Sequence, residues 1–372
     1  MTGGVAAAIR DAGISMRHLI DRLLGAPHWP TVGLTYALGL AGGFGAQALH
    51  LPLPMLLGSL LAVGAAAVGG LKPFGHLPQA PQKIRMVFVP VIGIAIGGAA
   101  RPEILAEAPR WVPSLLALCL FIPLVHFLGF RLLTATRRVD RRTAFYGTAP
   151  GGLVETVQMG EEAGADVQML AMLQFLRLIL TIVLVPVAFS WMEGHAVGSA
   201  AGAAVAGSAL GVRDVAVLAV AAVAGALIGL KLRLPAGHVL GPILLSAAAH
   251  MAGWTEGVPP GWLLAAAQVV VGTSLGVRFA GMPKGRILVA LRLALMNAVI
   301  TIGTAVGFAL ALAPLTGEPV RAVFLAFAPG GLIEMGLIAL SLKMSILYVT
   351  AHHLVRIILA VSFVRAFGGR ME

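Results

Sequence analysis

The sequence predicts an all-α integral membrane protein. It should contain two inverted repeats of about five transmembrane helices each, and each repeat should carry a re-entrant or broken Pro-Gly-Gly segment. Hydrophobic residues make up 59% of the 372 and charged residues only 11%, with a mean hydropathy of +0.94, whereas a soluble domain has roughly 25% charged residues. The apolar stretches are long and do not alternate as barrel strands do, which indicates helical spans. The heptapeptide Ala-Pro-Gly-Gly-Leu-x-Glu occurs twice, at residues 149–155 and 328–334.

The first 30 residues form a separate segment. Arg10, Arg17 and Arg22 stand among isoleucines and leucines, a pattern typical of an amphipathic helix on the membrane surface. A compact apolar core followed by a small-residue cleavage site is missing, so we expect no cleaved signal peptide.

Two membrane repeats follow, joined by a Gly/Ala/Ser-rich linker at residues 192–212. We expect the first repeat, residues 31–191, to contain spans near 32–49, 53–70, 84–100 and 111–133, an interrupted segment at 143–165 and a span near 167–190. The second repeat, residues 213–368, should contain spans near 214–230, 237–252, 261–280 and 287–313, an interrupted segment at 319–342 and a span near 345–366.

Each Pro-Gly-Gly motif interrupts an apolar stretch. Proline removes a backbone donor and glycine tolerates unusual dihedral angles, so each motif should break a helix. Broken backbone at membrane depth is tolerated where it is packed in protein or lines a wet cavity. A matched pair of breaks, one in each half, points to a binding site of the transporter type.

Several landmarks repeat in register. Gly330 lies 179 positions after Gly151 (330 − 151 = 179), and Arg356 lies the same distance after Arg177. The pair Gly93 and Gly97 matches Gly272 and Gly276 at this offset, while Gly58 matches Gly241 at 183 (241 − 58 = 183), which indicates a four-residue slip in a loop. The chain therefore contains an internal duplication.

The basic loops decide between parallel and inverted repeats. If the interrupted segments cross the membrane the repeats are parallel, and if they enter and leave on one side the repeats are inverted. With a cytoplasmic N-terminus, only inversion places Lys231, Arg233, Lys284 and Arg286 on the cytoplasmic side, where positive loops are enriched. We therefore expect both termini in the cytoplasm, the linker in the periplasm and the two Pro-Gly-Gly tips near the midplane.

The doubled motif, each copy followed by an arginine in a final span, resembles the AbrB-type bacterial membrane proteins. The resemblance covers nearly the whole chain and implies a carrier fold with inverted repeats and broken helices. Members are labelled as ammonia monooxygenases or as regulators of gene expression, and a soluble DNA-binding regulator of the same name is unrelated. Ser345 stands where the first copy has Asp166, and His353 where it has Gln174, so function need not be symmetric between the copies.

Four charged residues are the leading candidates for function. Glu155 and Glu334 follow their glycines in apolar surroundings, where burying a carboxylate costs about 2.5–3.5 kcal/mol even on permissive scales. Each could bind a coupling Na⁺ or H⁺, or could cap a broken half-helix. Arg177 and Arg356 could capture an anionic solute together with helix N-termini, or could form internal salt bridges with the two glutamates.

Weaker candidates come from glycine and polar positions in the spans. The paired glycines near residues 93 and 272 should mark close backbone contact, from which Thr273 and Ser274 could reach a cavity. Gln174, Asn297, His352 and His353 are more readily explained as interhelical hydrogen bonds. The predicted solute- or ion-binding set comprises Pro150, Gly151, Gly152, Glu155, Arg177, Pro329, Gly330, Gly331, Glu334, Arg356, Thr273 and Ser274.

The favoured function is a secondary transporter of the bacterial inner membrane. It would move a small, anionic or zwitterionic solute by alternating access, coupled to H⁺ or Na⁺. The alternative is a membrane regulator or sensor that affects gene expression through a metabolite or partner. The solute and the lipid bilayer are the expected partners, and a homodimer is an open alternative.

Several other functions are not expected. The net charge of +11 belongs to short loops and fits orientation and anionic lipid better than nucleic acid. The ten histidines show no metal-binding spacing and Cys119 is alone, so we predict no metal, no cofactor and no disulfide, and we reject the monooxygenase label. A phosphate-binding glycine loop is also missing, and the chain is not expected to be an enzyme.

Overall fold

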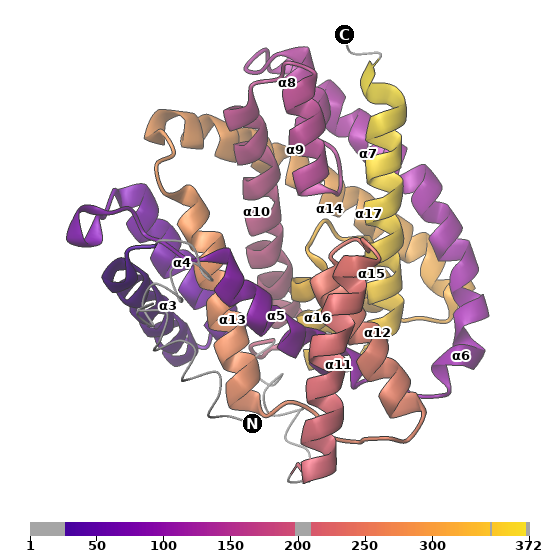
Figure 1. Ribbon diagram of the computed structural model, residues 1–372. Coiled ribbons are helices and arrows are strands. Elements are labelled where there is room, and N and C mark those ends of the chain that lie inside the picture. The colour runs from indigo at the N-terminus through magenta and orange to yellow at the C-terminus, as the bar shows by residue number, and fades with distance from the viewer. Residues whose placement is uncertain (1–26, 198–209, 343, 370–372) are drawn as a thin grey trace. The chain divides into compact units, whose positions relative to one another are not determined.

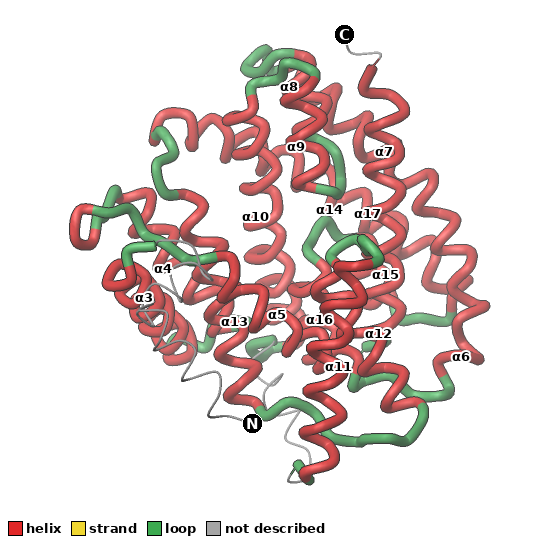
Figure 2. Tube along the Cα trace, in the orientation of Figure 1, coloured by secondary structure: helices red, strands yellow, loops and turns green. Residues whose placement is uncertain are grey.

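The computed structural model describes residues 27–197, 210–342 and 344–369. Within these ranges the chain is helical with no strand, as Figure 2 shows. This confirms the predicted all-α class. Most of the N-terminal segment 1–30 and of the linker 192–212 lies outside the described residues.

The predicted spans coincide with helices, labelled in Figure 1. The first repeat contains α3 (Trp29–Ala48), α4 (Pro54–Gly69), α5 (Gln82–Gly97), α7 (Val112–Ala135) and α10 (Val167–Glu193), with the short α6 (Ile104–Glu107) before α7. The second contains α11 (Val212–Lys231), α12 (Gly237–Met251), α13 (Gly261–Gly276), α14 (Lys284–Thr316) and α17 (Ile346–Gly368).

Length and exposed side chains both indicate a membrane environment. Among the described residues, six helices are long and apolar enough to cross a bilayer: α7, α10, α11, α13, α14 and α17. Their outward-facing side chains are large and apolar; Leu116 and Leu120 on α7 are 65% and 64% exposed, and Leu227 on α11 is 63% exposed. Contiguous apolar surface of this kind is stable against lipid rather than water. The chain is therefore a multi-pass membrane protein.

The chain divides into two compact units. Unit 1 comprises Met1–Val89 and Ala265–Gly281, and unit 2 comprises Pro90–Leu264 and Met282–Glu372. Unit 1 therefore holds α3, α4 and most of α13, whereas α7, α10, α14, α17 and both interrupted segments belong to unit 2.

Helices α3 and α4 of unit 1, and α11 and α12 of unit 2, pair through glycines. A Cβ atom built on Gly58 would lie 2.2 Å from the carbonyl oxygen of Gly42, and one on Gly241 would lie 1.9 Å from that of Gly225. Only glycine allows two helix backbones to approach so closely. Gly225 lies 183 positions after Gly42, and Gly241 lies 183 positions after Gly58. The two repeats therefore start with the same helix pair.

In unit 1, α13 packs against α4 through the glycine pair that the sequence singled out. A Cβ on Gly272 would lie 2.3 Å from the carbonyl oxygen of Leu56, and one on Gly276 would lie 2.9 Å from that of Leu60. This confirms the predicted close backbone contact.

In unit 2, the end of α5 packs against α12 in the same way. A Cβ on Gly93 would lie 2.8 Å from the carbonyl oxygen of Val239, and one on Gly97 would lie 2.4 Å from that of Ile243. These positions are the repeat equivalents of the four in unit 1. The third span of each repeat therefore packs on the second span of the other repeat.

Candidate functional site

Each Pro-Gly-Gly motif separates two short helices of unit 2. The first lies between α8 (Arg141–Gly147) and α9 (Leu153–Glu162), and the second lies between α15 (Val320–Phe327) and α16 (Leu332–Ser341). We call residues 148–152 the first break and residues 328–331 the second break. Both predicted interrupted segments are thus helix–loop–helix units.

The proline and glycine residues explain why the helices stop here. Pro150 and Pro329 carry no backbone N–H group and cannot continue a helical ladder. Gly152 has a φ of +63°, in the left-handed region that glycine adopts at no steric cost. Each break leaves the last carbonyl groups of α8 and α15 without partners inside their own helix.

At the first break, α10 supplies the missing donors. The guanidinium of Arg177 donates through Nη1 to the carbonyl oxygen of Ala149. Gln174 Nε2 donates to the carbonyl oxygens of Tyr146 and Ala149, at 2.7 and 3.3 Å. A positive group at the C-terminal end of α8 also complements the helix dipole.

At the second break, α17 does the same with equivalent residues. Arg356 donates through Nη1 to the carbonyl oxygen of Ala328 and through Nη2 to that of Gly330, at 2.6 Å. His353 Nε2 lies 3.0 Å from the carbonyl oxygen of Leu325, so Nε2 carries the proton. His353 Nδ1 then accepts from Arg356 Nη2 at 3.1 Å.

The two arginines are buried positive charges. Arg177 is 8% exposed and Arg356 3%, and the two guanidinium groups are near enough to repel one another. In the part of the chain that the structure describes, the ion pairs are those of Arg286 with Asp166 and of Arg321 with Glu193. Neither buried arginine pairs with a carboxylate there. The two arginines therefore do not form the salt bridges with the glutamates that the sequence offered as an alternative. They donate to backbone carbonyls instead.

The two glutamates occupy the third position of α9 and α16 but differ in burial. Glu155 is exposed, whereas Glu334 is 3% exposed. A Cβ on Gly331, the residue before α16, would lie 1.9 Å from Glu334 Oε2, so the carboxylate folds back over the helix N-terminus. That position favours a negative charge and matches the capping alternative.

The other motif glycines are packed within unit 2. A Cβ on Gly151 would lie 3.2 Å from Ala360 Cβ of α17. A Cβ on Gly330 would lie 2.4 Å from the terminal carbon of the Met335 side chain. The first break is thus packed against the closing helix of the second repeat.

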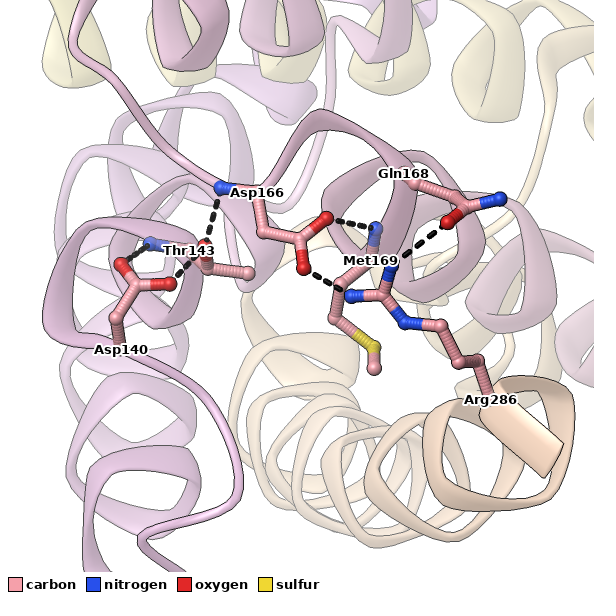
Figure 3. Close-up of polar contacts among 6 residues, drawn as sticks. All are labelled: Asp140, Thr143, Asp166, Gln168, Met169 and Arg286. Carbon is pink, nitrogen blue, oxygen red and sulfur yellow. Dashed lines mark hydrogen bonds and ion pairs between the residues drawn. The ribbon is translucent and has the colours of Figure 1, made fainter. Parts of the chain in front are cut away.

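A polar network joins the start of the first interrupted segment to its end (Figure 3). Asp140 accepts from the Thr143 backbone N–H at 2.8 Å and from the Thr143 hydroxyl at 2.5 Å. The Asp166 backbone N–H donates to the same hydroxyl oxygen at 2.9 Å. Residues at the beginning of α8 and α10 are therefore in direct contact.

The network continues to α14. Arg286 pairs with the Asp166 carboxylate and donates to Gln168 Oε1 at 2.6 Å. Burial tends to raise the pKa of Asp166, but the Met169 N–H and the Arg286 guanidinium outweigh it and hold this pKa below its ordinary value. The carboxylate stays ionised at neutral pH and keeps the three helix ends together.

A carboxyl group occupies the corresponding place in the second repeat. Glu318 precedes α15 and is partly buried. Burial raises the pKa of Glu318, and the nearby charge of Glu107 adds to the effect. The second repeat therefore has a partly buried carboxyl before α15, close to the position where the first repeat has the ion-paired network.

Thr273 and Ser274 belong to unit 1, whereas the ten other predicted site residues belong to unit 2. Thr273 is fully buried, and a Cβ on Gly39 would lie 2.2 Å from its hydroxyl oxygen. Ser274 donates to the carbonyl oxygen of Val270 at 2.7 Å, which anchors its hydroxyl to its own helix.

The structure adds residues that the predicted set leaves out. Gln174 and His353 act as interhelical hydrogen-bond partners, as the sequence indicated, and their acceptors include carbonyls near the ends of α8 and α15, next to the breaks. His126 of α7, which packs edge-on against Phe145 at 4.5 Å between ring centroids, was missed. Like Asn297, it is a polar residue within an apolar stretch of the sequence, and this pattern could have identified it.

Comparisons with known proteins agree with this architecture. The family model described as "Transition state regulatory protein AbrB" matches residues 74–370. A candidate regulator of Escherichia coli (strain K12) called AbrB is 27% identical over 308 residues, covering 82% of this chain and 86% of that protein. YhjN of Bacillus subtilis (strain 168) is 26% identical over 353 residues, covering 89% and 90%.

The helices and their exposed apolar faces define a multi-pass membrane protein with two interrupted segments. Since the family model matches well over half of the residues of this chain, the chain belongs to the AbrB family. This confirms the family resemblance seen in the sequence.

Proposed function

We propose that this protein is a secondary transporter of the inner membrane that moves a small anionic or zwitterionic solute by alternating access, coupled to H⁺ or Na⁺. The observation that carries the proposal is the pair of buried arginines. Two guanidinium groups repel one another and have no paired carboxylate in the described residues. Buried charge is costly unless it is compensated, and a bound anion would compensate it.

Contacts at the helix ends support re-entrant segments. The hydrogen bond from the Asp166 N–H to the Thr143 hydroxyl supports a first interrupted segment that returns to the level at which it began. A segment that crossed the membrane would end far from its start, since about 20 helical residues span 30 Å.

The two segments approach α10 from opposite ends, which supports inversion. Thr143 of α8 contacts Asp166 at the beginning of α10. Arg321 of α15 pairs with Glu193, the last residue of α10. Helix α10 has 27 residues and is about 40 Å long.

Cysteine labelling tests the inverted topology. In a variant with Cys119 replaced by Ala, single cysteines at the exposed positions Arg138 and Glu256 should react from opposite sides, Arg138 from the cytoplasm and Glu256 from the periplasm. Parallel repeats place both positions in the cytoplasm. Labelling of both from the cytoplasmic side in inverted vesicles contradicts the inverted arrangement.

Flux measurement tests the transport function. Purified protein in liposomes should accumulate at least one member of a panel of small carboxylates and amino acids when a proton or sodium gradient is imposed. Protein-free liposomes and liposomes without a gradient are the controls. If members bind but are never accumulated under either gradient, the carrier proposal is wrong.

A regulator is the second candidate, favoured by the name of the Escherichia coli relative. In that case a metabolite would bind at the breaks and alter the contacts of a partner protein. Binding without flux, together with co-purification of one partner, would support this function.

A further inference from the structure

The two breaks differ in the side chains that surround them. Positions 179 residues apart are equivalent in the two repeats, so the surroundings can be compared residue by residue. At four places the residue near the first break is polar or is glycine, and its equivalent near the second break is apolar. The equivalent pairs are His126 and Ala305, Gly129 and Phe308, Thr148 and Phe327, and Asn297 and Leu118.

The second break is filled by aromatic rings. Phe327, which directly precedes the break, has its ring centroid 5.6 Å from that of Phe308 and 5.1 Å from that of Phe121. Phe121 and Phe308 are 5.2 Å apart. Phe327 and Leu118 are both fully buried. These side chains offer no hydrogen bond to a polar solute.

The first break is surrounded by polar groups instead. A Cβ on Gly129 of α7 would lie 2.4 Å from Asn297 Oδ1 of α14 and 3.2 Å from Thr148 Cβ, so these two side chains meet at Gly129. His126 lies one helical turn away on the same face of α7. Arg177 donates to the carbonyl oxygen of Ala149, the residue after Thr148, which places the guanidinium beside the same cluster.

Two side chains of this cluster carry polar atoms that have no hydrogen-bond partner among the described residues. In the described part of the chain, both ring nitrogens of His126 and Oδ1 of Asn297 are buried without a partner. His126 is 2% exposed and Asn297 3%. Buried polar groups are normally paired because an unpaired one retains its full cost of desolvation. Two such residues beside a buried guanidinium point to a ligand.

We infer that the solute is recognised at the first break, by Arg177, His126 and Asn297, and that it is a small carboxylate that also carries a hydrogen-bond donor. This inference rests on the proposed transport function. The guanidinium binds the carboxylate. The Oδ1 atom of Asn297 and the unprotonated ring nitrogen of His126 accept from a hydroxyl or ammonium group of the solute, which neither could do from a plain carboxylate.

A matched set of probes tests the inference. Acetate, glycolate and glycine share a carbon skeleton and differ only in the donor, and propionate, lactate and alanine form a second set. The affinity of each for the purified protein is measured from the ligand-dependent rise in its thermal midpoint. The wild-type protein should bind the hydroxyl or ammonium member of one set at least about tenfold more tightly than the plain acid, because a plain acid leaves the acceptors unpaired.

Variants at equivalent positions locate the site. Asn297→Leu, which introduces the residue found at position 118, should abolish the preference for the donor-bearing member and leave binding of the plain acid within about twofold. Leu118→Met, a volume-conserving change at the equivalent position, should keep the preference. The thermal midpoint without ligand reports folding, and Asn297→Ser is measured in the same way if the leucine variant does not fold.

Three results overturn the inference: no probe binds, the wild-type protein shows no preference, or Leu118→Met loses the preference as fully as the Asn297 variants. The outcomes separate this inference from the transport function. Gradient-driven flux without the preference leaves the carrier standing and removes the recognition site. A preference that depends on Asn297, without flux, leaves the site standing and removes the carrier.

Discussion

Arg177→Met should lower solute flux by about 10- to 100-fold, the equivalent of the 1.5–3 kcal/mol that a hydrogen bond to a charged group contributes. The thermal midpoint should change little. Methionine retains the unbranched stem, the change removes the repulsion from Arg356, and Gln174 still donates to the Ala149 carbonyl. Flux per folded molecule and the thermal midpoint are measured on the same preparation.

Gln174→Met is the matched control for this prediction. It removes two hydrogen bonds, to the carbonyl oxygens of Tyr146 in α8 and of Ala149 in the first break, but leaves the charge in place. We expect it to reduce stability by about 1–3 kcal/mol and to leave flux per folded molecule nearly unchanged. If both variants lose flux in proportion to stability, the arginine only closes the end of α8 and binds no solute.

Arg356→Met should show the opposite balance. Arg356 donates to Ala328 and Gly330 and to the ring of His353, so its loss leaves more acceptors unpaired. The side chains that pack on Phe327, directly before this break, are by contrast aromatic. A larger loss of stability and a smaller specific loss of flux than for Arg177→Met would agree with recognition at the first break.

Local signals made the helices predictable. Long apolar runs and the two Pro-Gly-Gly motifs are visible in any window of the sequence, and both act through the backbone of the same segment. The last span was expected at residues 345–366 and is Ile346–Gly368; the second interrupted segment was expected at 319–342 and comprises α15 and α16.

The partners of the candidate residues were less predictable. The position of Arg177 in an apolar span shows that it needs a partner, but a carboxylate and a free carbonyl satisfy that need equally well. The choice depends on how α10 packs on α8, a contact between residues 28 positions apart. Gly93 and Gly97 likewise predicted a close contact, while their partners in α12 are known only from the fold.

The glycine pairs give the largest expected effect on folding. Gly241→Ala places a methyl group 1.9 Å from the carbonyl oxygen of Gly225. No rotamer relieves this contact, because the backbone fixes the position of Cβ and the atom that it meets is a backbone oxygen of a packed helix. The helices α11 and α12 must separate, and overpacking of this kind costs about 3 kcal/mol or more. We expect little monodisperse protein by size-exclusion chromatography, and Gly58→Ala should behave alike in unit 1.

Gly307→Ala is the control for the glycine prediction. Gly307 lies in α14, where an added Cβ has no heavy atom within 4 Å. Alanine is favoured over glycine inside a helix by roughly 0.5–1 kcal/mol, so this variant should be as stable as the wild-type protein or slightly more stable. Equal yields of folded Gly241→Ala and Gly307→Ala would mean that α11 and α12 are not in backbone contact. The packing of α5 on α12 would then also be in doubt, because Gly93 and Gly97 of α5 contact the backbone of the same helix α12.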